Sequence, residues 1–127
     1  MLSITPLFVL LFVVMNIVIV MPIGPHRNKV GVPLWGGENK LDRLVRGHGN
    51  FIEFVPLFLV ALATAEYLGT TDIALWAGGL LMLVGRLVHY VGMVALKNPI
   101  PARLVGTLLS LTSMAVLALC IGWKILI

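Results

Sequence analysis

The sequence predicts an all-α integral membrane protein, a bundle of four transmembrane helices that forms a single domain over residues 1–127. Hydrophobic residues make up 60% of the chain and charged residues only 11%, whereas soluble domains average about 25% charged. Two apolar runs, at residues 4–23 and 104–123, are each long enough to cross a hydrocarbon core of about 30 Å as a helix.

The four helices are expected over about residues 5–27, 40–68, 73–96 and 102–125. Pro22 and Pro25 follow the first apolar run, and proline bends or ends a helix because it lacks a backbone N–H. The first three residues carry no basic side chain, which a secretory signal would have. We therefore expect the first apolar segment to be retained as a membrane helix.

Turn-forming residues separate the other helices. A polar, glycine-rich stretch precedes the second helix, in which Pro56 predicts a kink. Gly69-Thr70-Thr71 predicts a tight connection to the third helix, with Thr71 or Asp72 as its N-cap. Asn98-Pro99-Ile100-Pro101 separates the third helix from the fourth. Small residues inside the helices are expected to allow close helix approach, namely Gly78, Gly79, Gly85 and Gly106.

Basic side chains concentrate at one end of the predicted bundle, and this determines its expected orientation. Eight of the nine fall there: Arg27, Lys29, Lys40, Arg43, Arg46, Arg86, Lys97 and Arg103. Only Lys124 falls at the other end, with Glu66 and Asp72. Cytoplasmic loops carry the excess of Lys and Arg, so we expect both charged loops in the cytoplasm and both termini outside.

Polar side chains form stripes on three helices, in the half of the bundle that carries the basic residues. In chain order the stripes are Arg43, Arg46, Asn50 and Glu53; Arg86, His89 and Met93; and Arg103, Thr107 and Ser110. A helix advances about 100° per residue, which puts His48 nearly opposite the first stripe and Tyr90 beside the second. Charges inside a membrane cost roughly 2.5–3.5 kcal/mol each near its centre, so these stripes should face each other or a neighbouring subunit.

Together the stripes predict a polar, mostly cationic cavity open toward the cytoplasm. The arginines suit a carboxylate, which a guanidinium binds through two parallel hydrogen bonds. Glu53 can receive an ammonium group or hold an arginine, and Asn50 offers both a donor and an acceptor. An anionic ligand with carboxylates and an amine would use all of these groups.

Simpler roles for the same residues stay open at this point. Arg43 and Arg46 can act as anchors that extend to the lipid headgroups. Glu53 can pair with an arginine only to allow helix packing, and His89 can be a packed, hydrogen-bonded imidazole. Side chains on the fourth helix, Thr107 and Ser110, commonly bond a backbone carbonyl.

Other kinds of site find no support in the sequence. The three histidines, His26, His48 and His89, have no spacing that suits a metal ion, so no metal site is expected. Cys120 is the single cysteine, which excludes an intrachain disulfide. The net charge of +4 is explained by basic residues near helix ends, and no nucleic-acid partner is expected.

Several of these motifs resemble the MAPEG family, the membrane-associated proteins of eicosanoid and glutathione metabolism. Arg46-x-His48-x-Asn50-x-x-Glu53, followed by Phe54-Val55-Pro56-Leu57, resembles the second-helix signature of the family. Gly85-Arg86-x-x-His89 is similar to its third-helix motif, and the segment from Pro99 to Arg103 is similar to the start of its fourth helix. The short first loop looks most like the small bacterial branch, which implies a bacterial inner membrane.

The resemblance implies a glutathione-dependent transferase or peroxidase that works as a homotrimer in the lipid bilayer. Glutathione would be the co-substrate, bound between subunits near the cytoplasmic face. The residues implied in binding are Arg46, Asn50, Glu53, Arg86, His89 and Tyr90. Arg103 matches the arginine that stabilises the glutathione thiolate in active members, and this thiolate would attack a hydrophobic electrophile or a lipid peroxide.

Three positions depart from the prostaglandin synthase branch of that family. Gly49 stands where that branch has an extra arginine, Met93 where it has a tyrosine, and Leu104 where it has a serine. Prostaglandin synthesis is therefore not expected of this chain.

Two other functions are alternatives to the enzyme. A non-catalytic member of the family would keep the trimeric membrane fold without the chemistry. A small solute or multidrug transporter would also fit four helices in a short chain. Cation exporters of that kind need an acidic residue in the first helix, where this chain carries only Asn16, so the transporter is the weaker alternative.

Overall fold

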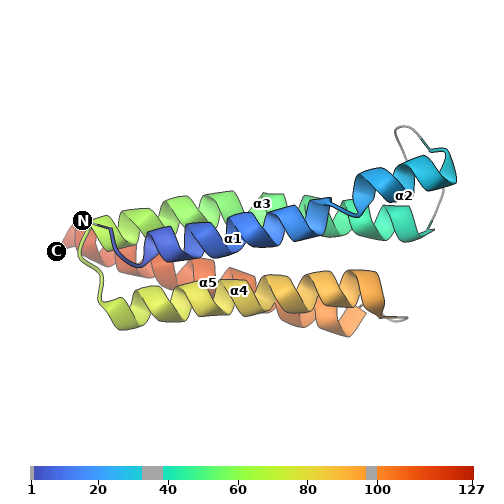
Figure 1. The fold of residues 1–127 in the computed structure, drawn as a ribbon. Coiled ribbons are helices and arrows are strands. Elements are labelled where there is room, and N and C mark those ends of the chain that lie inside the picture. Colours follow the sequence, from blue (N-terminus) through green and yellow to red (C-terminus); the bar gives the residue numbers. More distant parts are fainter. Residues whose placement is uncertain (1, 33–38, 97–99) are drawn as a thin grey trace.

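The computed structural model describes residues 2–32, 39–96 and 100–127, and these fold into helices that run the length of one bundle (Figure 1). The helices are α1 (Thr5–Val20), α2 (Ile23–Val30), α3 (Asn39–Tyr67), α4 (Asp72–Ala95) and α5 (Ile100–Leu126). With α1 and α2 taken together, the four are long and apolar enough to cross a membrane. The prediction of an all-α bundle with four spans is confirmed. Both termini lie at one end of the bundle and α2 at the other (Figure 1).

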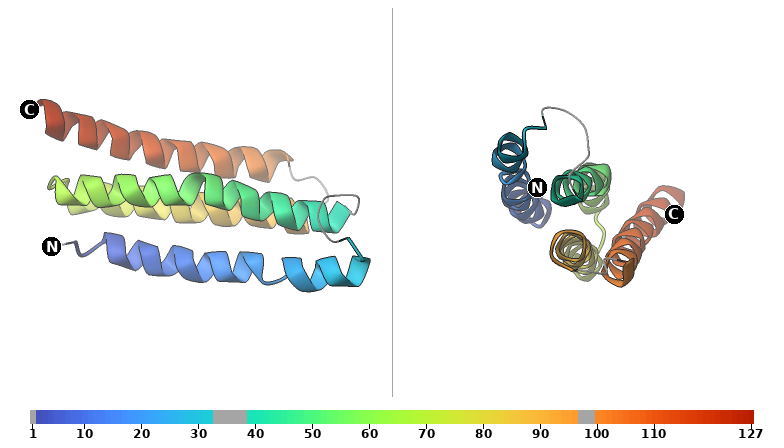
Figure 2. Two further views of the ribbon diagram at one scale, coloured as in Figure 1. Left: turned by 90° about the horizontal axis from the view of Figure 1, so that it is seen from above. Right: turned by 90° about the vertical axis from the view of Figure 1, so that its right-hand side faces the viewer.

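Viewed along its axis, the bundle places α3 beside α1, with α4 and α5 on the other side (Figure 2). Aromatic side chains fill the space between α1, α3 and α4. The ring of Phe12 lies 6.1 Å from Phe51 and 5.8 Å from Phe58, measured between centroids. The Phe8 ring meets Trp76 of α4 edge to face at 5.5 Å. This core joins α1 to the rest of the bundle.

The first span consists of two helices and extends further than expected. Pro22 and Pro25 have no N–H to donate, so the α-helical ladder is interrupted between Val20 and Ile23. The predicted end near residue 27 is wrong, because α2 continues to Val30. It stops at Gly31, whose φ of 69° is the left-handed conformation that commonly ends helices, and whose N–H bonds the carbonyls of Arg27 and Asn28.

The other helix ends lie within two residues of the predictions. Gly69, with a φ of 74°, ends α3 in a Schellman motif, in which it donates to Glu66 O and Thr70 donates to Ala65 O. Thr71 occupies the N-cap position of α4 but makes no side-chain cap bond. Helix α5 begins at Ile100, before the expected residue 102, because a proline in the first turn removes an N–H that has no helical partner anyway. Lys97, Asn98 and Pro99 lie outside the described residues.

Glycines bring α4 and α5 into backbone contact. A Cβ built on Gly106 would lie 2.6 Å from the Gly85 carbonyl oxygen, and one built on Gly92 would lie 2.4 Å from Ala102 Cβ. Gly79 allows α1 to pack closely against α4, because a Cβ built on it would lie 2.0 Å from the Phe8 ring. The prediction that Gly79, Gly85 and Gly106 allow close helix approach is confirmed, and a Cβ built on Gly78 would lie 3.3 Å from the Leu117 side chain of α5.

A carboxylate at the end of α3 caps the start of α1. Glu66 accepts hydrogen bonds from the backbone N–H groups of Ser3, Ile4 (2.8 Å) and Thr5 (2.7 Å), and from the Ser3 hydroxyl (3.2 Å). The first N–H groups of a helix have no partner within it, and their partial positive charge favours an anion. Glu66 therefore fastens the N-terminal end of the first span to the second.

Substituting Glu66→Gln is expected to lower the free energy of unfolding by about 1–2 kcal/mol, the usual value of a helix cap plus its charge. Denaturant unfolding in detergent, followed by circular dichroism, measures the change. Asp72→Asn is the matched control, since Asp72 is an exposed acid in the first turn of α4 at the same end of the bundle. Equal losses of unfolding free energy in the two variants would show that the hydrogen bonds of Glu66 add no stability beyond that of an exposed acid.

Candidate functional site

Arg86 is the centre of the polar region that α3, α4 and α5 share. Its side chain is only 2% exposed. Nε donates to Ser110 Oγ at 2.8 Å, Nη2 to Gly106 O at 3.2 Å and Nη1 to Asn50 O at 3.2 Å. The guanidinium carbon lies 4.4 Å from the centroid of the Phe54 ring, a cation–π contact. One side chain of α4 is thus held by groups from both α3 and α5.

The acceptors around Arg86 are neutral and leave part of its binding capacity unused. A guanidinium has five N–H donors, and its bonds to the described residues use three of them. Glu53 lies near enough for its negative charge to act on Arg86. A buried cation with remaining donors on Nη1 and Nη2 is suited to receive an anionic ligand.

The polar stripe of α3 lies along the outer edge of this region. Arg46 and Glu53 are exposed on the surface of the single chain, and Asn50 is half-buried. The Asn50 amide donates to Arg46 O at 3.2 Å within the helix, while its backbone carbonyl accepts from Arg86. These residues therefore share a face of α3 that is largely exposed on the single chain.

His89 lies next to Arg86 on α4, and Arg103 lies on the neighbouring helix α5. His89 is 3% exposed, one turn after Arg86 on α4, and its backbone packs against Gly106 of α5. The charges of Arg86 and Arg103 both act on it. Arg103 is exposed in the first turns of α5. The structure thus places Arg86 beside His89 on α4 and in contact with the backbone carbonyl of Asn50 on α3.

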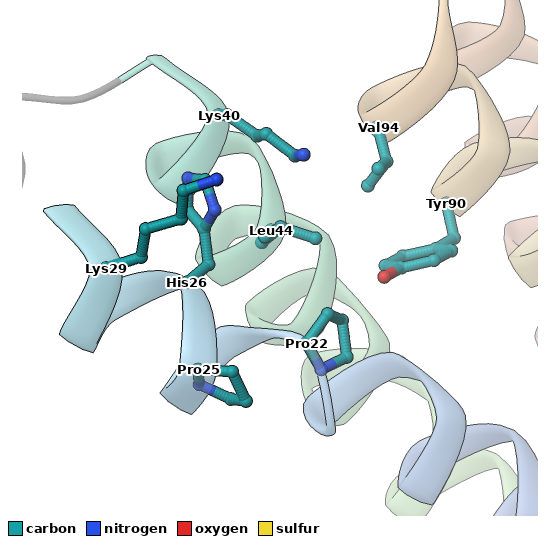
Figure 3. Close-up of a pocket in the computed structure, with 8 residues that line it drawn as sticks. All are labelled: Pro22, Pro25, His26, Lys29, Lys40, Leu44, Tyr90 and Val94. Carbon is teal, nitrogen blue, oxygen red and sulfur yellow. The ribbon is translucent and has the colours of Figure 1, made fainter.

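Tyr90 lies apart from this group. Its ring packs against Gly47, where a Cβ would be 2.9 Å from Cδ2. Its hydroxyl points into a separate pocket between α2, α3 and α4 (Figure 3). The side chain expected beside the Arg86 stripe is therefore directed toward another side of α4.

One of the simpler roles, that of Ser110, is found in the structure, and Arg43 has a role that differs from the one expected. Ser110 Oγ donates to Gly106 O at 2.8 Å, which confirms that it bonds a backbone carbonyl, although the same oxygen also accepts from Arg86. Arg43 donates to Leu96 O at 2.8 Å and so holds the C-terminal end of α4.

Phe54 and Gly106 are parts of the site that the pattern of polar residues does not indicate. Phe54 presents its ring to the guanidinium, and Gly106 offers its carbonyl because no side chain shields it. Both residues are identified only by their contacts with the Arg86 guanidinium. The closest signal in the sequence is the position of Phe54, which immediately follows Glu53.

The fold and the site define a class of protein: a four-span helical membrane protein with a buried arginine where three of its spans meet. The comparison with protein families agrees with this class. The profile of the MAPEG family matches residues 4–123, and the chain belongs to that family.

Two curated relatives share part of this sequence. Both are named inner membrane protein YecN, one from Escherichia coli strain K12 and one from Escherichia coli O6:H1. Each is 35% identical over 57 residues, which is 45% of this chain. The matched region spans 44% of the length of these relatives, so it covers less than half of either one.

Proposed function

We propose that the protein is a glutathione-dependent transferase or peroxidase of the membrane. Proteins of the MAPEG family often use glutathione, and the match to that family covers residues 4–123. The observation that carries the proposal is Arg86, buried between three helices with N–H donors remaining and with Glu53 nearby. A glutathione carboxylate would bind the guanidinium, and its ammonium group would bind Glu53.

The outward direction of the α3 stripe supports a site between subunits. Arg46, Glu53 and Arg103 are exposed on the single chain, and Glu53 lies at the middle of α3 (Asn39–Tyr67). An ion facing lipid at that depth costs on the order of 2.5–3.5 kcal/mol. A second copy that covers the stripe would remove this cost and close the site, which supports a homotrimer with glutathione between its subunits.

Arg103 is the residue we assign to the thiolate. A cation near the thiol favours its ionised form, and only the ionised form is a good nucleophile. The thiol proton passes to water. A lone pair of the thiolate sulfur then forms a C–S bond, while the leaving group departs with the electrons of the bond that breaks. With a lipid peroxide, two glutathione molecules become the disulfide, and the peroxide becomes an alcohol and water. The charged loops would face the cytoplasm, where glutathione is available.

Glutathione binding tests the proposal. The protein purified in detergent is expected to bind glutathione stoichiometrically in calorimetry and to show the ultraviolet absorbance of a thiolate. S-methylglutathione, whose methylated sulfur cannot form a thiolate, should bind without that absorbance. No binding at millimolar glutathione would exclude the enzyme, and binding without a thiolate signal would favour a non-catalytic member of the family.

The variant Arg103→Ala separates thiolate stabilisation from binding. We expect conjugation of chlorodinitrobenzene to fall about 100-fold, as when one group that stabilises a reacting anion is removed, with the affinity for glutathione changed much less. Arg103→Lys should recover part of the rate. Lys124→Ala removes one positive charge at the opposite end and serves as the control. Full activity in Arg103→Ala would refute this role.

A further inference from the structure

A pocket lies at the end of the bundle where α2 meets α3 and α4, apart from the Arg86 site. It has a volume of about 480 Å³ and is lined by Pro22, Pro25, His26, Lys29, Lys40, Leu44, Tyr90 and Val94 (Figure 3). Arg86, Asn50, Glu53 and Arg103 are not among the residues that line it. The proposed glutathione site therefore leaves this pocket without a role.

The lining divides into a basic part and an apolar part. His26 and Lys29 are three residues apart on α2 and so share one face of that helix. Lys40, from the first turn of α3, extends toward α4 across the same space (Figure 3). None of the described lining residues is acidic, so the described charges at the pocket are all of one sign. An anion is the ligand that such a rim attracts.

The apolar part of the lining favours an anion that also carries a hydrophobic portion. Pro22, Leu44 and Val94 form apolar walls of the pocket, and the Tyr90 hydroxyl points into the same space (Figure 3). The pocket also lies where the apolar α1 gives way to α2, the helix that carries the charges. In a membrane this is the depth at which acyl chains end and phosphates begin.

We propose that this pocket binds the headgroup of an anionic membrane lipid. The lipid phosphate lies against Lys29 and Lys40, its glycerol and first acyl carbons lie against Pro22 and Leu44, and the Tyr90 hydroxyl donates to an ester carbonyl. Basic pockets between membrane helices bind anionic headgroups in this way. The inference goes beyond the proposed enzyme and does not depend on glutathione.

Native mass spectrometry of the whole protein in detergent tests the proposal, with phosphatidylglycerol as the anionic probe and phosphatidylcholine as the neutral one. We expect bound phosphatidylglycerol to be retained in preference to phosphatidylcholine. Each lysine near a lipid phosphate contributes roughly fivefold in affinity, so Lys29→Gln should weaken binding about fivefold, and Lys29→Gln with Lys40→Gln about 30-fold. Lys29→Arg should restore it.

Lys124→Gln is the matched control, because it removes one positive charge at the opposite end of the bundle. An equal loss in this control, or no loss in the double variant, would overturn the proposal. Displacement of the lipid by millimolar inorganic phosphate would assign the pocket to a soluble anion. Displacement by glutathione would overturn the separation of the two sites.

Discussion

Gly106→Ala is expected to lower the free energy of unfolding by about 3 kcal/mol, at the upper end of what overpacking of a tight interior costs. The added methyl group would lie 2.6 Å from the Gly85 carbonyl oxygen and 2.7 Å from the backbone nitrogen of His89. Both are backbone atoms of α4, so no side-chain rotation can relieve the overlap. The two helices must move apart.

The separation of α4 from α5 has a second consequence, at the site. Gly106 O accepts from Arg86 Nη2, and Ser110 on the same helix accepts from Nε. When α5 moves away from α4, both bonds lengthen and the guanidinium loses its fixed position. We therefore expect Gly106→Ala to lose glutathione binding as well as stability.

Gly122→Ala in the same helix is the control for this prediction. Nothing lies within 4 Å of the Cβ position of Gly122, and replacing a helical glycine by alanine stabilises a helix by up to about 1 kcal/mol. Because both variants share that gain, the difference between their denaturant midpoints measures the helix contact alone. A Gly106→Ala variant as stable as Gly122→Ala would contradict the close packing of α4 and α5.

Arg86→Met is expected to fold and to lose glutathione affinity by about 100-fold or more. The loss corresponds to two hydrogen bonds between charged partners, at about 1.5–3 kcal/mol each. Methionine fills a similar volume, and the groups left behind keep partners. Ser110 Oγ still donates to Gly106 O at 2.8 Å, and the carbonyls of Asn50 and Gly106 lie within helices.

Binding calorimetry on folded protein measures this effect, with Lys124→Met as the control for removal of one positive charge. Arg86→Lys should give an intermediate affinity, since an ammonium group keeps the charge but cannot reach acceptors on both α3 and α5. Unchanged affinity in folded Arg86→Met would show that Arg86 ties the helices together and does not contact the ligand.

The sequence is sufficient to predict the four spans because the membrane imposes their length and composition. Helix ends are less predictable where two local signals compete. Pro22 and Pro25 suggest that the first helix ends near residue 27, but a new helix starts between them and runs to Gly31, whose lack of a side chain permits the left-handed turn. The residues after the interruption also favour a helix, so the span continues as α2.

The candidate site could be predicted only as stripes of polar residues. Helical spacing places Arg46, Asn50 and Glu53 on one face, but it does not say what that face packs against. The structure buries Arg86 and leaves Arg46 exposed, a difference that depends on how α3, α4 and α5 are arranged. The direction of Tyr90 depends on the same arrangement. Which of these side chains are buried depends on contacts between helices that are distant in sequence, and the periodicity of one helix cannot show it.

The carboxylate of Glu66 also has a consequence for how the chain enters a membrane. It caps residues 3–5, yet it is synthesised more than sixty residues after them. Until then the N-terminal end of α1 has only water or lipid headgroups for its first N–H groups. The first span therefore gains this cap only after α3 has formed and has brought Glu66 to the same end of the bundle as Thr5. The cap on α1 is therefore completed only once α3 is in place.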